Sequence, residues 1–189
     1  MAWHEDARFC PLCGSSLGTR AIEGVPRKAC PDCRYVLYPN PGTGVAALVV
    51  AGRRILFVRR AIEPYRGSWG FPAGFQEYAE TPQECIVRET REETGLGIRL
   101  LGLHALLYTR DDPRKRANLL VFRAVAEPGE PVVGDDVLEV GWFALDRPPD
   151  EIAFENNRLI LEDLRLRFPE GPLDGEPGGE ARIFCDGAQ

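Results

Sequence analysis

Apolar residues gather in short runs along the middle of the chain, and turn-forming residues separate these runs. The runs predict strands at 45–50, 55–58, 69–71, 98–108, 118–126 and 137–144. Two other segments, 82–94 and 154–168, have features of helices. In the second segment, Ile160, Leu161 and Leu164 fall on one face of a helix.

The first helix has clear signals at both ends. Thr81 precedes it and Glu84 follows three residues later, which is the spacing of a capping box. Pro82 stands at the first helical position, where its missing N–H does no harm. Gly95 can adopt the left-handed conformation that ends many helices. We therefore expect a helix from Pro82 to about Thr94.

The two ends of the chain differ in character from the middle. Residues 1–40 hold two cysteine pairs and end in a turn-rich Tyr-Pro-Asn-Pro-Gly junction, which predicts a domain boundary. Residues 41–168 form the main predicted domain. Residues 169–189 begin with many Gly, Pro and Glu residues and predict a flexible tail, in which 183–185 could pair as a short strand.

The composition narrows the class of protein. The chain has 189 residues and a formal net charge of −6, so its overall field does not attract nucleic acid. A phosphate-containing substrate would need a local cation to offset that charge. No apolar run is long enough to span a membrane, and the first residues lack the apolar segment of a secretory signal. These observations predict a cytoplasmic protein with no membrane partner.

Four of the six cysteines form two Cys-x-x-Cys pairs. The number of residues between the first pair, Cys10 and Cys13, and the second pair, Cys30 and Cys33, is typical of a four-cysteine zinc ribbon. Four protein ligands fill a tetrahedral site, so the predicted Zn²⁺ has a structural role. The charges between the two pairs nearly cancel, which does not favour binding of nucleic acid.

Three glutamates of the first predicted helix are placed to share a cation. Glu89, Glu92 and Glu93 are spaced i, i+3 and i+4, so their side chains lie on one face. Carboxylates so close repel one another, and a hard cation such as Mg²⁺ relieves that repulsion. A bound metal can polarise a phosphoryl oxygen while a remaining carboxylate takes a proton from water. Taken alone, the cluster is more typical of a solvated acidic helix than of a metal site.

The wider spacing resembles the signature of the Nudix hydrolases, Gly-x5-Glu-x7-Arg-Glu-U-x-Glu-Glu-x-Gly-U, with U a bulky aliphatic residue. The fixed positions are matched by Gly74, Glu80, Arg88, Glu89, Glu92, Glu93 and Gly95. Thr90 departs from the first aliphatic position, where its hydroxyl can bond back to the preceding turn. The resemblance covers about residues 43–168. It implies an α/β/α sandwich on a mixed sheet, and hydrolysis of a nucleoside diphosphate derivative with Mg²⁺ or Mn²⁺.

The resemblance also implies roles for individual residues. Glu89 and Glu93 would be the main metal ligands. Glu92 would be a further ligand or the general base, and the Ala73 carbonyl another ligand. Arg88 would belong to the catalytic set by orienting the helix and the preceding loop through ion pairs, with Glu80 as its partner.

Other candidates rest on residue type alone. For contact with the substrate they are Arg59, Arg66, Arg110, Glu139, Tyr65, Phe75 and Tyr108. For an acid recruited from outside the motif they are Asp135, Asp136 and Glu139. Each is also typical of an ordinary surface or core side chain.

A zinc ribbon before a Nudix motif resembles two groups. NADH pyrophosphatases carry a Ser-Gln-Pro-Trp-Pro-Phe-Pro-like motif after the signature, and residues 101–112 hold no such motif. ADP-ribose and FAD pyrophosphatases look closer, because Phe143-Ala144-Leu145-Asp146 and Ile62-Glu63-Pro64 are similar to theirs. We therefore expect hydrolysis of ADP-ribose to AMP and ribose 5-phosphate, or of FAD to AMP and FMN.

Other functions stay open at this point. They are hydrolysis of NADH or of an oxidised nucleoside triphosphate, processing of capped RNA held by the ribbon, and nucleotide binding by a regulator without activity. Dimers are common in the resembled groups, so a homodimer is a further option by analogy.

Overall fold

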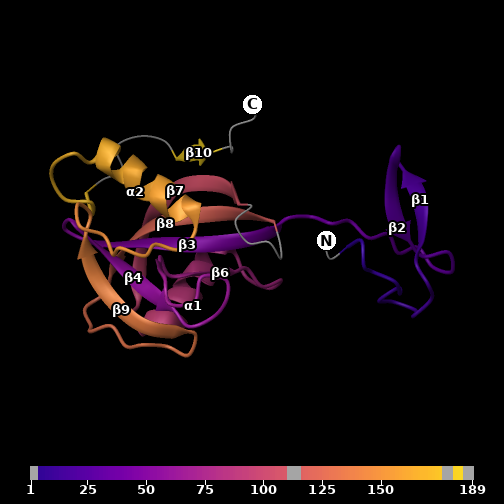
Figure 1. Ribbon diagram of the computed structural model, residues 1–189, viewed down its shortest axis with the longest axis horizontal. Helices are drawn as coiled ribbons and strands as arrows, with labels where there is room; N and C mark the ends of the chain where they lie inside the picture. Colours follow the sequence, from indigo (N-terminus) through magenta and orange to yellow (C-terminus); the bar gives the residue numbers. More distant parts are fainter. Residues whose placement is uncertain (1–3, 110–115, 176–180, 185–189) are drawn as a thin grey trace.

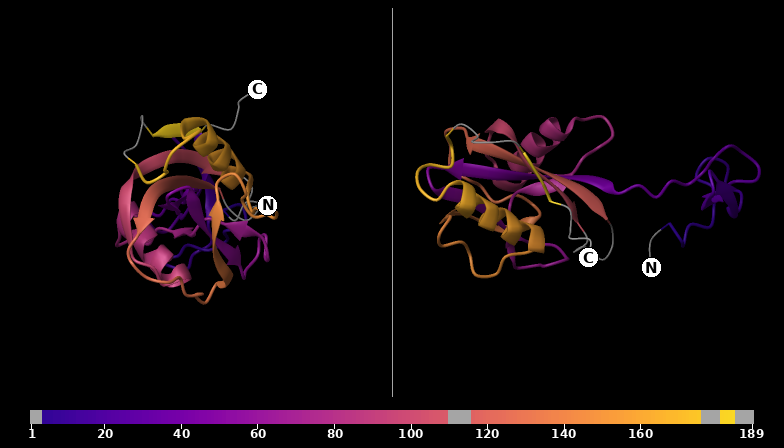
Figure 2. Two further views of the ribbon diagram at one scale, coloured as in Figure 1. Left: turned by 90° about the vertical axis from the view of Figure 1, so that its left-hand side faces the viewer. Right: turned by 90° about the horizontal axis from the view of Figure 1, so that it is seen from above.

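The computed structural model describes residues 4–109, 116–175 and 181–184. These residues form a small two-stranded sheet and a mixed sheet of eight strands with a helix on each face (Figures 1 and 2). The small sheet pairs β1 (Gly18–Ile22) with β2 (Val25–Ala29). The remaining elements are β3 (Gly42–Ala51), β4 (Arg54–Arg60), β5 (Trp69–Gly70), β6 (Ala73–Phe75), α1 (Pro82–Thr94), β7 (Ile98–Thr109), β8 (Ala117–Ala126), β9 (Val137–Ala144), α2 (Glu155–Arg167) and β10 (Arg182–Phe184).

The sheet is mixed because its central strands run in both directions. Its order is β10-β7-β8-β3-β4-β5, with β6 paired to β3 and β9 paired to β4. Strands β3 and β8 are parallel, whereas β7 and β8 are antiparallel. This arrangement is the α/β sandwich expected from the sequence.

Strand β3 lies at the centre of two hydrophobic cores, one on each face of the sheet. Alternate side chains of a strand point to opposite faces. Val45, Ala47 and Val49 therefore pack with Cys85 and Ile86 of α1. The intervening residues of β3 pack with the apolar face of α2. This double burial explains why the strand reads as one continuous apolar run.

The predicted ends of α1 are confirmed. The Thr81 side chain accepts a hydrogen bond from the Glu84 amide, and the Glu84 side chain accepts one from the Thr81 amide. Gly95 ends the helix with φ 70°. The Thr90 hydroxyl donates to the Ile86 carbonyl at 2.7 Å, so its departure from the aliphatic pattern is accommodated inside the helix.

Two short features were not predicted. The sequence suggests a break at 72–74, yet Ala73–Phe75 forms β6, because three residues are enough to pair antiparallel with the middle of β3. The β1–β2 hairpin lies between the two cysteine pairs. It stands apart from the main sheet, at the end of an extended connection through residues 37–41 (Figures 1 and 2).

The segment after α2 lies against the domain at several described residues, although its composition suggests flexibility. Leu173 is fully buried. The Arg53 guanidinium donates to the carbonyls of Phe168 and Gly171 at 3.1 and 2.8 Å. Strand β10 then pairs in parallel with β7. Composition averages over a whole segment, so it does not reveal one apolar side chain that anchors the segment. The division into domains stays a prediction.

A buried charged cluster ties α2 to the sheet. The Asp163 carboxylate lies 3.2 Å from His104 Nε2 on β7 and 3.1 Å from Arg182 Nε on β10. These close contacts lack the alignment of hydrogen bonds. Burial lowers the pKa of His104 to about 4, which leaves the imidazole neutral at pH 7. The cluster anchors helix α2, whose first turn borders a cleft.

In the part of the chain that the structure describes, no helix is both long and apolar enough to cross a membrane.

Candidate functional site

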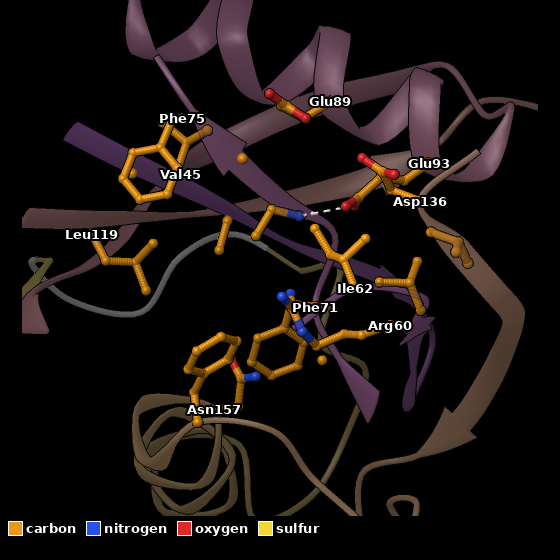
Figure 3. Close-up of a pocket in the computed structure, with 18 of the residues that line it drawn as sticks. Val45, Arg60, Ile62, Phe71, Phe75, Glu89, Glu93, Leu119, Asp136 and Asn157 are labelled. Atoms are coloured by element: carbon orange, nitrogen blue, oxygen red, sulfur yellow. Dashed lines mark hydrogen bonds between the residues drawn. The ribbon is translucent and has the colours of Figure 1, made fainter. Parts of the chain in front are cut away.

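A cleft of about 1080 Å³ opens beside the N-terminal half of β3. Helix α1 and the loop before β9 supply one wall, on which Figure 3 shows Glu89, Glu93 and Asp136. Strand β4, the segment before β6 and the first turn of α2 supply the opposite wall, which includes Arg60 and Asn157. A cleft of this size can hold a small molecule with several polar groups.

Glu93 is a partly buried carboxyl on the first wall. Its Oε2 accepts a hydrogen bond from the Ala73 amide at 3.0 Å, drawn as a dashed line in Figure 3. Burial raises the pKa of Glu93 to about 8, because the ionised form is disfavoured away from water. The amide is a neutral partner, so a cation bound at the cleft would stabilise the ionised carboxylate further.

Arg88 holds three carboxylates around α1. It forms two contacts with Glu80, at 2.7 and 3.0 Å, which confirms the expected ion pair. It also lies 2.8 Å from Glu89 and 3.0 Å from Glu92. Hydrogen bonds from Arg88 lower the pKa of Glu80 to about 2, so this residue is ionised at neutral pH. The network fixes the loop before α1 against the helix.

Gly74 lets β6 approach the carboxylate of Glu89. A β-carbon at residue 74 would overlap that carboxylate, so only glycine leaves room for the observed arrangement. Burial is the main cause that raises the pKa of Glu89, and Arg88 opposes the shift. The position of Glu89, one fixed residue of the signature, thus depends on the absence of a side chain at Gly74, another fixed residue.

The residues predicted to hold Mg²⁺ border the cleft together. They are Ala73, Glu89, Glu92 and Glu93. Their donors are oxygens, which suits a hard divalent cation. Within the described chain, only the four cysteines bring three or more metal-ligating atoms within 4.8 Å of one another. The glutamates do not converge in this way, and two of them, Glu89 and Glu92, pair with Arg88. The donor set fits the cation by its chemistry and its place, and Arg88 competes for two of the ligands.

Only some of the residues that were predicted to contact the substrate line the cleft. Arg59 does not line the cleft: it donates to the Gly67 carbonyl at 2.7 Å and lies 3.7 Å from Glu139. Its neighbour Arg60 lines the cleft instead. Arg60 and Val58, two residues apart on β4, both border the cleft, as the alternation of side chains along a strand requires. Residue type alone does not indicate which of two consecutive arginines lies on that face.

The other candidates also fall into two groups. Phe75, Asp135 and Asp136 line the cleft. Tyr65, Arg66 and Tyr108 are not among its lining residues, although the ring of Tyr65 packs on one that is. Arg110 lies outside the described residues. Sequence reasoning missed Phe71, Phe154, Asn156 and Asn157, because single aromatic and amide residues carry no spacing signal.

The two cysteine pairs meet at the base of the β1–β2 hairpin. The sulfurs of Cys10 and Cys33 lie 3.6 Å apart, and those of Cys13 and Cys30 lie 3.5 Å apart. All four sulfurs lie within 4.8 Å of one another. A tetrahedral Zn²⁺ with its usual Zn–S bonds needs sulfurs about 3.8 Å apart, so the cluster fits the ion. Gly14 adopts φ 77° directly after the first pair, where the chain turns tightly.

We expect the purified protein to contain roughly one zinc per chain, and the Cys30→Ser protein to contain almost none. The substitution removes one of four ligands from a site with no spare donor. Zinc is measured by mass spectrometry of the acid-digested protein. Cys85→Ala is the matched control, because Cys85 is a buried residue of α1 and lies outside the cluster. Equal zinc content in all three proteins would contradict the assignment.

Comparison with known proteins agrees with this fold. A family model described as NUDIX domain matches residues 40–164. The chain is 34% identical over 135 residues to the ADP-ribose pyrophosphatase of Methanocaldococcus jannaschii, covering 71% of this chain and 79% of that protein. It is 32% identical over 173 residues to the NAD-capped RNA hydrolase NudC of Pseudomonas aeruginosa, covering 91% of this chain and 60% of that protein. A NUDIX hydrolase from Nitrosomonas europaea has a crystal structure with TM-score 0.82 and 30% identity, covering 95% of this chain and 100% of that one.

These matches, together with the seven fixed residues of the signature and the cleft beside them, show that the protein belongs to the Nudix family of hydrolases. The family model covers well over half of the chain. The chain spans about 60% of the length of the NudC relative, so the substrate of that protein does not transfer directly.

Proposed function

We propose that the protein hydrolyses the diphosphate bond of ADP-ribose, with AMP and ribose 5-phosphate as products. The observation that carries the proposal is the buried Glu93 carboxyl beside Glu89 on the wall of a cleft large enough for a nucleotide. Two carboxyls held close together and partly away from water lower the stability of a fold. Such a pair therefore indicates a site that binds a cation and a substrate. The likeness to the ADP-ribose pyrophosphatase, over most of both chains, supports the choice of substrate.

The residues on the α1 wall have distinct roles in this reaction. Glu89, Glu92, Glu93 and the Ala73 carbonyl would hold Mg²⁺ or Mn²⁺, which supplies positive charge for the phosphoryl oxygens. Arg88 keeps α1 and its loop in register. Glu92 and Asp136 flank Glu93 on the cleft and are the candidates to accept the proton of the attacking water.

NADH is the second candidate. The NudC relative supports it, since that protein is named for NAD-capped RNA. Against it, residues 101–112 lack the motif expected of NADH pyrophosphatases. ADP-ribose and NADH share an adenosine diphosphate half, so one cleft could accept either.

The test is hydrolysis of a panel of ADP-ribose, NADH, FAD and oxidised dGTP with Mg²⁺ or Mn²⁺. Products are separated by chromatography and quantified as AMP, FMN or nucleoside monophosphate. The proposal predicts the highest kcat/KM for ADP-ribose. Faster hydrolysis of another compound would change the substrate, and no hydrolysis of any compound would favour a binding protein without activity.

A further inference from the structure

The wall opposite the carboxylates is built from residues that the hydrolysis itself does not need. Phe71, Phe154, Asn156 and Asn157 line it together with Arg60, and Figure 3 shows Phe71, Arg60 and Asn157 on the side of the cleft opposite α1. This wall combines aromatic surfaces with two side-chain amides. Such a combination is typical of a site that recognises a polar ring.

Asn156 is a buried amide with hydrogen-bonding groups to spare. Only 9% of the residue is exposed. Among the described residues, no hydrogen bond to its side chain is present, and the residue borders the cleft. Buried side-chain amides nearly always have a partner in the protein. The Asn156 amide is not among the described side-chain groups that are sealed from solvent without a partner, so it is open to the cleft, where a ligand can be that partner.

The neighbouring amide is already engaged within the protein. Asn157 Nδ2 donates to the Ala153 carbonyl at 2.8 Å and packs against Gly70. Phe154, which caps α2, offers no side-chain hydrogen bond to the first turn. Of the two side chains, only that of Asn156 therefore has both its NH2 donor and its oxygen acceptor available to a ligand.

The aromatic rim beside Asn156 is held in an unfavourable backbone conformation. Phe154 has φ 58° and Tyr65 has φ 63°, values that residues with a β-carbon rarely adopt. Their rings meet at 4.8 Å, and the Arg60 guanidinium lies 5.0 Å from the centre of the Phe154 ring. Two strained residues from distant segments thus support each other at the edge of the cleft. Strain of this kind gathers at ligand sites.

We propose that this wall binds the adenine ring of the substrate and that Asn156 selects its 6-amino edge. The inference rests on the proposed function and deepens it. An asparagine amide presents a donor beside an acceptor, which matches N7 and the 6-amino group of adenine. A base with an oxygen at position 6 places an acceptor opposite the amide oxygen and is rejected. Phe71 and Phe154 supply apolar surface for the ring.

The test compares ADP-ribose with its hypoxanthine analogue, inosine diphosphoribose. The wild-type protein is expected to prefer ADP-ribose by roughly tenfold in kcat/KM, and Asn156→Leu to reduce this preference to nearly one. Asn156→Gln keeps the amide and should keep the sign of the preference. Titration calorimetry with AMP and IMP, which does not depend on turnover, should show the same order of affinities.

Glu162→Gln is the matched control, because Glu162 lies on the solvent side of the same helix. It should leave the preference unchanged, and thermal unfolding should confirm that every variant is folded. Equal wild-type affinities for AMP and IMP, or a preference that survives in Asn156→Leu, would overturn the inference. If the wild-type protein binds AMP over IMP but does not cleave ADP-ribose, the proposed function fails and the adenine site stands.

Discussion

Replacing Glu93 by glutamine is expected to lower kcat for diphosphate hydrolysis roughly 1000-fold while making the metal-free protein more stable. Glutamine keeps the size of the side chain but cannot carry the negative charge that holds a cation at the cleft. Turnover of the preferred substrate at saturating Mg²⁺ measures the loss. A variant that kept a third of the activity would contradict the role of Glu93.

The expected gain in stability follows from the burial of the same carboxyl. Burial raises the pKa of Glu93 from the ordinary value of 4.5 to about 8. Between these values the folded protein binds more protons than the unfolded one, so Glu93 costs stability as pH rises. The gain in Glu93→Gln should therefore be absent near pH 4 and greatest above pH 8. Thermal unfolding without metal at pH 5 and pH 8 tests this difference, which we expect to be a few degrees.

Glu92→Gln separates burial from charge in this experiment. The Glu92 side chain is 59% exposed, whereas Glu93 is partly buried. Its substitution also removes a predicted ligand or base but relieves no burial. We expect a smaller loss of kcat than for Glu93 and no gain in stability. An equal stability gain in both variants would mean that general repulsion among the glutamates, rather than burial, is the cause.

The parts of the fold that the sequence predicted are those governed by local rules. The capping box at Thr81 and the left-handed Gly95 depend on residues within one turn, and both are confirmed. The cysteine spacing predicted the cluster for a similar reason, since two short turns bring each pair together. The carboxylates of α1 share a face because helical geometry requires it.

The opposite wall of the cleft depends on contacts between distant segments, which local patterns do not encode. Arg60 borders the cleft from the face of β4 that also carries Val58, and the ring of Phe154, from a distant segment, lies against its guanidinium. Asn156 reaches the same space because α2 packs on the far side of the sheet, where Asp163 and strand β10 hold it. No spacing rule joins residues 60 and 156, so the sequence could predict the chemistry of this family but not the surface that selects its substrate.

Replacing Gly74 by alanine is expected to lower kcat/KM roughly 100-fold, although alanine adds a single methyl group. A β-carbon at residue 74 would overlap the Glu89 carboxylate. Either Glu89 must rotate away from the cleft, or β6 must move off β3 and take the Ala73 partner of Glu93 with it. Both responses displace a predicted metal ligand, so the apparent affinity for Mg²⁺ should fall together with kcat.

Gly129→Ala is the control for this substitution, because a β-carbon there would make only ordinary contact with Leu96, at 3.5 Å. Activity as a function of Mg²⁺ concentration distinguishes the two proteins, and thermal unfolding shows whether Gly74→Ala remains folded. We expect Gly129→Ala to match the wild type in both measurements. If Gly74→Ala kept normal Mg²⁺ dependence and normal kcat/KM, Glu89 would have room to move without loss. Glu89 would then not be a metal ligand that needs a fixed position. Gly74 would matter only for the conformation of the backbone.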